Sequence, residues 1–327
     1  MPDETNQPVL DTLVSNAALA VVDIETTGLH PGADRVVEIS VVRIEPGAAP
    51  ILALDTLVNP SRRVAATEIH GITDADVSDA PTFDDIAGDV AQALSGAVVA
   101  GYNVYFDVRF LEDEFKRVRL RQTPPHVCLM YLRPMLGLGS RCCLADACKA
   151  HGIRHEDAHT AAFDAMAGAG LWRLYASAMA EKGIETFGDL RKLKSYKFLD
   201  SLSLPTLRQW MIAFLTPTGR RKPRSQSRIS DDTQRRVARV REYLDALSAV
   251  VADLELTVVE VENLARKRDQ LGLGPDEVRA VHGRVFAAML SEALADSSVT
   301  EEEWDRLSRL HECLTGLGWA PGATRGA

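Results

Sequence analysis

Three strand-like runs near the start of the chain constrain its fold more than any other feature. Residues 19–25 (LAVVDIE) are almost entirely apolar, 36–44 (VVEISVVRI) are rich in β-branched residues, and 51–60 (ILALDTLVNP) end at an Asn-Pro pair. Runs of this length and composition are typical of β-strands. Because the connections between them are short, we predict an antiparallel start to a sheet.

Helical and strand-like segments alternate after the third run. A short buried strand is expected at 97–103 (AVVAGYN), and 126–132 (HVCLMYL) is ambiguous. Helices are predicted over the following ranges: 81–96, 107–120, 144–153 and 159–183. This order predicts a mixed α/β domain over residues 18–182, which is a usual domain size.

The rest of the chain has a different character. Residues 1–17 carry acids and no basic stretch, so we expect a disordered lead and no secretory signal. Residues 183–230 contain short helices and a run rich in Pro, Gly, Ser and Arg (TPTGRRKPRSQSR), which predicts a basic connector. A separate all-α domain is predicted over 231–320, followed by a tail at 321–327.

Charge is unevenly distributed along the chain. The net charge of the chain is −9. Residues 1–175 contain 14 Lys and Arg against 24 Asp and Glu, and residues 242–327 contain 8 against 16, so both ends are acidic. Residues 176–241, with 15 Lys and Arg against 6 Asp and Glu, are basic. An acidic protein is not a bulk electrostatic binder of nucleic acid. The basic middle segment is equally compatible with contact to phosphates and with a solvated linker.

The cysteines indicate a reducing compartment. Their count of five is odd, and the adjacent pair Cys142-Cys143 fits no disulfide framework, so we expect free thiols and a cytoplasmic protein. The spacing Cys148-x2-His151-x3-His155 allows a zinc site, but a buried cysteine and two surface histidines explain it better. No run of about 18 uncharged apolar residues exists, so no membrane association is predicted.

Two acids in the first predicted strand are the centre of the functional argument. Asp23 and Glu25 are two residues apart, so alternation places both side chains on one face of the strand. Charges in an otherwise apolar strand are costly unless something compensates them, and a bound cation does so. In Thr26-Thr27-Gly28, which follow, the glycine permits a tight turn, and hydroxyls or amides there could hold a terminal nucleotide.

Three further polar residues occur in later segments of the same domain. Asp107 stands between a predicted strand and helix, where capping alone would explain it. His159 and Asp164, taken singly, are ordinary surface or packed residues. Together, however, separate segments bring these groups to the carboxyl-end region of a sheet, where α/β domains place their sites. Asp164 would lie one turn inside the last helix, with His159 in the loop or first turn.

The ordered set resembles the DEDDh branch of the DnaQ-like exonucleases, which have a ribonuclease H-like fold. The resemblance covers residues 18–175 and rests on DIETTG (23–28), GYNVYFDVRFL (101–111) and HTAAFD (159–164). It implies a five-stranded mixed sheet with flanking helices. Tyr102 departs from the pattern, since the family often has histidine there, but it is not among the metal ligands.

The resemblance implies a 3′→5′ exonuclease that uses two Mg²⁺ or Mn²⁺ ions. By resemblance, Asp23 bridges both ions, Glu25 and Asp164 hold the ion on the nucleophile side, Asp107 supports the other, and His159 is the general base. It also implies contacts to the substrate from six residues: Thr26, Thr27, Gly28, Leu29, Asn103 and Phe106.

The expected partner is a nucleic acid 3′ end, with DNA favoured over RNA. An RNA-trimming exonuclease would share every catalytic residue, so it remains an alternative. A non-catalytic end-binding module is a second alternative, although it would usually have lost one of the five site residues.

The C-terminal helical region contains two capping boxes, Thr257–Glu260 and Thr300–Glu303, 43 residues apart. With the Leu-Gly endings that follow, they predict a duplicated helical unit. Residues 245–318 resemble TerB-like helical domains, which implies a protein-interaction or positioning role.

Overall fold

The computed structural model describes residues 8–120, 122–155, 160–207, 231–251, 257–293, 300–318 and 320. The chain divides into two compact units. The first comprises residues 1–27, 35–67 and 72–228, and the second comprises 28–34, 68–71 and 229–327.

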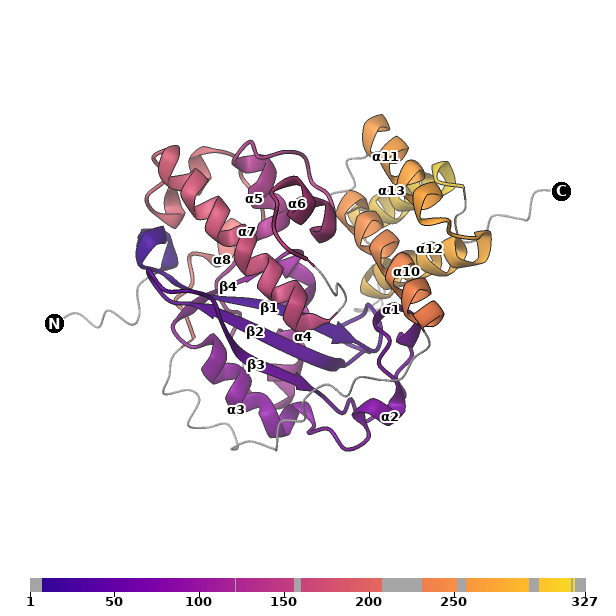
Figure 1. The fold of residues 1–327 in the computed structure, drawn as a ribbon, viewed down its shortest axis with the longest axis horizontal. Helices are drawn as coiled ribbons and strands as arrows, with labels where there is room; N and C mark the ends of the chain where they lie inside the picture. The colour runs from indigo at the N-terminus through magenta and orange to yellow at the C-terminus, as the bar shows by residue number, and fades with distance from the viewer. Residues whose placement is uncertain are drawn as a thin grey trace. The chain divides into compact units, whose positions relative to one another are not determined.

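A five-stranded mixed sheet forms the centre of the first unit (Figure 1). The strands are β1 (Ala18–Thr26), β2 (Val36–Ile44), β3 (Ile51–Leu57), β4 (Ala97–Gly101) and β5 (His126–Cys128), in the spatial order β3-β2-β1-β4-β5. β2 is antiparallel to β1 and to β3, whereas β4 is parallel to β1 and to β5. The predicted antiparallel start and the predicted mixed sheet are therefore confirmed.

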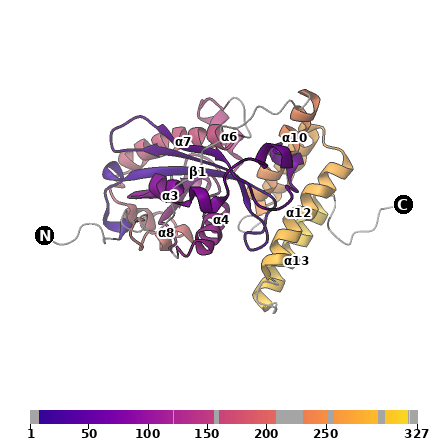
Figure 2. The same cartoon turned by 90° about the horizontal axis from the view of Figure 1, so that it is seen from below.

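Helices cover both faces of this sheet, so the first unit has three layers (Figure 2). The long helix α7 (Ala161–Glu181) lies on one face against β1 and β2, while α3 (Phe83–Leu94) and α4 (Val104–Arg117) lie on the other. The shorter helices of this unit are α2 (Asp74–Val77), α5 (Leu129–Met135), α6 (Leu144–Ala150) and α8 (Phe198–Ser201), whereas most of the short helix α1 (Thr67–His70) belongs to the second unit.

The core of the first unit lies between these layers. Leu19, Ile39, Phe83, Phe110 and Tyr175 are each less than 2% exposed and come from β1, β2, α3, α4 and α7. Burying one large apolar side chain contributes roughly 1.5–3 kcal/mol, so burial on both faces fixes the sheet between its helices. This explains why β1 and β2 are continuous apolar runs, interrupted only by a few polar side chains.

Local signals set where the helices begin. α3 follows Thr82, which forms a capping box with Asp85. α7 follows Thr160, whose side chain accepts a hydrogen bond from the Phe163 amide. Such bonds satisfy amides that have no partner inside the helix, and they hold the start of each helix in place.

Two predicted boundaries differ from the structure. In the described part of the expected disordered lead, residues 8–17 form two 3-10 turns, η2 (Val9–Asp11) and η3 (Val14–Asn16). The Val9 amide donates to the Leu204 carbonyl at 3.3 Å and the Val14 amide to that of Glu185 at 2.8 Å. Burial of both valines against the later segment gives this lead a fixed structure.

The first part of the expected connector also belongs to the first unit. Residues 187–192 form η4 (Phe187–Lys192), and the Leu207 carbonyl accepts from the Gly96 amide at 3.0 Å. Phe187, Leu190 and Phe198 are fully buried, which explains why 183–207 packs instead of acting as a linker. The basic run 216–228 lies outside the described residues.

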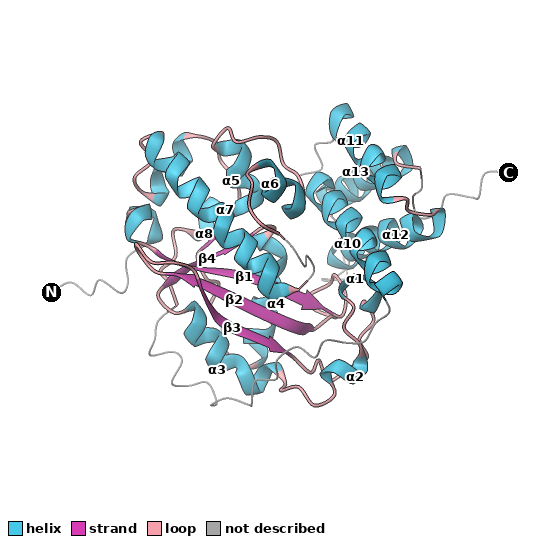
Figure 3. Ribbon diagram, in the orientation of Figure 1, coloured by secondary structure: helices cyan, strands magenta, loops and turns pink. Residues whose placement is uncertain are grey.

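The described elements of the C-terminal part are the helices α10 (Asp231–Val251), α11 (Val258–Leu271), α12 (Pro275–Ala293) and α13 (Glu301–Gly316) (Figure 3). α10 packs against α11 and α12, and α12 packs against α13. The predicted capping boxes at Thr257 and Thr300 are confirmed, each with the hydroxyl accepting from the amide three residues later. Across the described helices, none is long and apolar enough to cross a membrane.

Candidate active site

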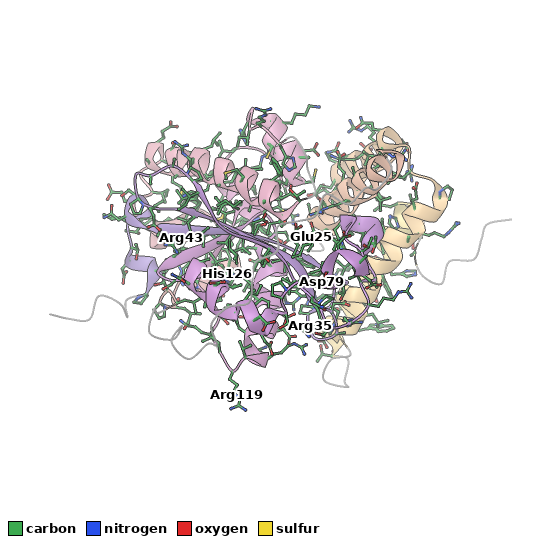
Figure 4. All side chains as sticks on the ribbon, turned by 60° about the horizontal axis from the view of Figure 1, so that its bottom comes forward. Glu25, Arg35, Arg43, Asp79, Arg119 and His126 are labelled. Carbon is green, nitrogen blue, oxygen red and sulfur yellow. The ribbon has the colours of Figure 1, made fainter. Side chains whose placement is uncertain are left out.

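β1 places the first two acids at one end of the sheet. Asp23 pairs with Ser40 and Glu25 with Glu38 on β2, so the Asp23 and Glu25 side chains share the face that α7 covers. Figure 4 shows Glu25 at the end of the sheet away from Arg43. Asp23 is half-buried and Glu25 is 6% exposed. Asp23 Oδ2 and Glu25 Oε1 are both buried oxygen atoms.

Asp107 reaches the same place from the next strand along the sheet. β4 pairs with β1 only as far as Val21, and α4 begins three residues after β4 ends. Asp107 Oδ1 accepts a hydrogen bond from the Ile24 amide at 3.2 Å, and Ile24 lies between Asp23 and Glu25. Asn103, not Asp107, is the N-cap of α4, so capping does not account for this buried aspartate.

Asp164 lies in the first turn of α7, and two close approaches, one to β1 and one to β2, fix this end of the helix over the sheet. Gly168, one turn later on the same face of α7, lies against Val21, because a Cβ built there would be 2.9 Å from Val21 Cγ1. At the start of the helix, the Ala161 amide donates to Glu38 Oε2 at 3.3 Å. Asp164 lies between these two points along α7, and its side chain is 7% exposed.

Glu38 is a buried acid beside the candidate site that the sequence pattern did not single out. It is 1% exposed, lies directly opposite Glu25, and accepts from the first amide of α7. A carboxylate at a helix N-terminus is favoured by the helix dipole as well as by the hydrogen bond. The available signal was a single acid in the apolar run VVEISVV, but its position opposite Glu25 required the strand register.

A histidine contacts Asp164, although it is not the one that the sequence pattern selected. His155 Nε2 lies 2.7 Å from Asp164 Oδ1, and the two side chains are 8% and 7% exposed. His159 lies outside the described residues. Among the described residues, Cys148, His151 and His155 do not form the zinc site that their spacing allowed. The His155 side chain contacts Asp164, and the His151 ring packs edge-on against Tyr175.

The chemistry of these groups fits a divalent cation. Burial raises the pKa of the Asp107 carboxyl to about 8, while backbone hydrogen bonds, including that from Ile24, act in the opposite direction. A buried carboxylate of this kind becomes ionised most readily when a cation compensates its charge. Carboxylate oxygens are the ligands that Mg²⁺ prefers. Within the described ranges, no three His, Cys, Asp or Glu side chains are already close enough to form a metal site.

A closed loop follows β1 and contains several of the residues expected to bind substrate. The Thr27 amide donates to the Arg35 carbonyl at 2.8 Å, and the Arg35 amide donates to Thr27 Oγ1 at 3.1 Å. A Cβ at Gly28 would lie 2.3 Å from Asp34 Oδ2, an oxygen that accepts from the His30 amide. Only glycine fits at this position without displacing the Asp34 carboxylate.

The other expected substrate residues occupy different settings. Thr26 and Thr27 are buried, whereas Leu29 is half-buried. Asn103 and Phe106 lie at the N-terminus of α4, and the Phe106 ring packs on Phe110. In the same segment, Tyr102 Oη donates to the Cys142 carbonyl at 2.8 Å, so its hydroxyl has a structural contact.

An ion pair joins the loop after β1 to the helix that carries Asp107. The Arg35 guanidinium donates to both carboxylate oxygens of Glu114, at 2.7 and 2.8 Å. Glu114 Oε1 also accepts from the Val36 amide at 3.3 Å. The Glu114 side chain is only 2% exposed, so this pair fixes α4 to the start of β2.

The family comparison agrees with this arrangement. The model of the family described as Exonuclease (RNase_T) matches residues 20–171. This range begins in β1, ends within α7 and includes all four carboxylates. Residues 20–171 of this chain are therefore similar to the Exonuclease (RNase_T) family.

Curated relatives resemble the same part of the chain. A DNA polymerase III subunit epsilon-like protein from Rhodobacter capsulatus is 32% identical over 185 residues, which is 54% of this chain and 26% of that protein. A PolC-type DNA polymerase III from Thermotoga petrophila is 28% identical over 187 residues, covering 56% of this chain and 14% of that protein. The chain thus spans about a quarter or less of the length of these relatives.

Solved structures of exonucleases also show similarity. E. coli exonuclease I in complex with a dT13 oligonucleotide matches 51% of this chain and 42% of its own, with 21% identity and a TM-score of 0.44. Exonuclease X in complex with a 5′-overhanging duplex DNA matches 50% of this chain and 93% of its own, with 24% identity and a TM-score of 0.39. Scores this low add no support to the fold, which the strand order of the sheet defines.

Proposed function

We propose that this protein is a metal-dependent 3′→5′ exonuclease that hydrolyses phosphodiester bonds at nucleic acid 3′ ends and releases nucleoside monophosphates. The observation that carries the proposal is the bond from the Ile24 amide to Asp107, which joins the α4 acid to the pair on β1. The close packing of α7 against the sheet supports Asp164 as a further member of this set. The match of residues 20–171 to the exonuclease family gives independent support.

Four carboxylates would hold the ions, for which we propose two Mg²⁺ or Mn²⁺. Asp23 would serve both ions, Glu25 and Asp164 one of them, and Asp107 the other. When bound, such ions activate the attacking water and stabilise the charge on the leaving oxygen. The protein supplies the anionic, largely buried setting, and Glu38 and Gly168 keep α7 close to β1.

His159 is proposed as the general base that accepts a proton from the attacking water. It directly precedes Thr160, the N-cap of α7, and is five residues before Asp164. Histidine suits this role at neutral pH. We propose that the 3′-terminal nucleotide contacts six residues at the ends of β1 and β4: Thr26, Thr27, Gly28, Leu29, Asn103 and Phe106.

DNA is the proposed substrate, because the curated relatives include proteins named as a DNA polymerase III subunit epsilon-like protein and as PolC-type DNA polymerase III. A repair or proofreading-like role follows. The five cysteines are free thiols, which supports a reducing compartment such as the cytoplasm. For the helical region at 231–320 we propose a TerB-like module that binds a protein partner.

The test is digestion of single- and double-stranded DNA and RNA, labelled at either end, by the intact chain with Mn²⁺. We expect immediate release of a 3′ label as mononucleotide and gradual shortening of 5′-labelled DNA. Chelator and Asp23→Asn should each stop the reaction. Faster digestion of RNA than of DNA would make RNA the substrate. Digestion from the 5′ end, or no hydrolysis, would overturn the proposal.

A further inference from the structure

His155 belongs to the segment between α6 and α7, nine residues before the aspartate that it contacts. Its Nε2 atom lies 2.7 Å from Asp164 Oδ1, and neither side chain is more than 8% exposed. The contact therefore connects a loop to the first turn of α7 in a place that water scarcely reaches. Neither the family pattern nor the proposed catalytic set uses His155.

The geometry of this contact constrains the carboxylate. An ionised carboxylate only accepts hydrogen bonds, so the imidazole Nε2–H is the donor. A distance of 2.7 Å is that of a strong, charge-assisted bond. One directed bond to Oδ1 restricts rotation of the carboxyl group about its last torsion, which is otherwise broad. It thereby determines where Oδ2 points.

Metal-binding carboxylates depend on such neighbours. A ligand that is already oriented loses less freedom when the ion binds, and partners of this kind typically contribute roughly 10–100-fold to metal affinity. Here the ligand sits on a helix whose position Gly168 and Glu38 already fix. The remaining freedom of Asp164 is that of its side chain, and His155 restricts it.

We propose that His155 is a positioning residue that orients the Asp164 carboxylate for a divalent cation. Its role differs from that proposed for His159, because it acts through Asp164 and not on the substrate. The inference rests on the proposed function, in which Asp164 is a ligand.

The test measures Mn²⁺ affinity of the intact chain by isothermal titration calorimetry, without substrate. His155→Ala should weaken binding by roughly 10–100-fold. His155→Gln keeps a side-chain N–H donor and should restore most of the affinity. His151→Ala is the matched control, because His151 lies in the same segment but packs on Tyr175, and it should bind Mn²⁺ like the wild type. Thermal unfolding of each metal-free variant checks that the fold is retained.

The outcomes separate the two proposals. Wild-type or tighter binding by His155→Ala would overturn the positioning role alone. A glutamine variant no better than the alanine variant, with both still folded, would also overturn it, since the hydrogen bond would then be irrelevant. Failure of the wild type to bind Mn²⁺ would overturn the proposed function and this inference with it.

Discussion

Asp107 Oδ1 accepts a hydrogen bond from the Ile24 amide at 3.2 Å. Ile24 lies beyond the last residue pair that joins β1 to β4, so the aspartate takes the place of the missing strand partner. The bond therefore does two things: it satisfies a strand amide and holds a buried carboxyl beside Asp23 and Glu25. It also links local folding to the proposed chemistry.

The buried Asp107 carboxyl predicts a pH-dependent stability in the absence of divalent cations. Its pKa is raised from 3.8 to about 8 in the folded protein, so the folded state keeps a proton that the unfolded chain releases. The free energy of unfolding should therefore fall as pH rises between these two values. Asp107→Asn retains an oxygen acceptor for Ile24 but does not titrate. Thermal unfolding in chelator should show a smaller decline for this variant, and equal declines would contradict the assignment.

Gly168 predicts a limit on the distance between α7 and β1. A side chain there meets Val21 Cγ1 at 2.9 Å, so Gly168→Leu should force the helix away from the strand. Overpacking of this kind costs about 1–3 kcal/mol. Exonuclease activity should fall together with stability, because Asp164 moves with the helix. Ala180→Leu, at an exposed position of the same helix, is the control. Urea unfolding measures the stability of both variants, and a nuclease assay measures their activity. Equal effects at the two positions would refute the close approach.

Glu38 predicts a difference between two substitutions at one position. Glu38→Ala removes the acceptor for the Ala161 amide in a buried place, and an unsatisfied buried donor costs about 1–3 kcal/mol. Glu38→Gln keeps an acceptor oxygen and should lose less stability. Denaturant unfolding compares the two variants. If alanine and glutamine were equally destabilising, the bond to the start of α7 would not be what Glu38 provides.

Breaking the Arg35–Glu114 ion pair, which joins the loop after β1 to α4, should strongly lower the stability of the protein. Glu114→Ala leaves the Arg35 guanidinium without its two-pronged partner, and breaking a buried pair costs on the order of 3–5 kcal/mol. Arg35 is 18% exposed, which places the expected loss toward the lower end. Asp113→Ala breaks a more exposed pair with Arg117 on the same helix and should cost less than about 1 kcal/mol. Similar losses of stability in the two variants, measured by denaturant unfolding, would contradict a stabilising role of the buried pair.

The parts of the fold that local sequence encodes were predictable. Continuous apolar runs marked β1 and β2, and Thr-x-x-Glu patterns marked the starts of α11 and α13. The Asp23 and Glu25 pair stood out because charges in an apolar strand need compensation. In each case the physical reason lies within a few neighbouring residues.

Other features depend on contacts between distant segments. The residues around Val9 and Val14 are held by hydrogen bonds to the 185–204 region, so their short sequence taken alone resembles a disordered lead. Glu38 required the strand register, and His155 required the loop to return onto α7. No periodicity or local pattern records such approaches.

Crystals of the protein soaked in Mn²⁺ provide the most direct measurement, through anomalous diffraction. We predict peaks bound by carboxylate oxygens of Asp23, Glu25, Asp107 and Asp164, at distances near 2.0–2.2 Å as for a hard divalent ion. In Asp23→Asn crystals those peaks should be lost or weakened. A map with no manganese at these four side chains, under conditions in which the ion reaches the crystal, would contradict the account.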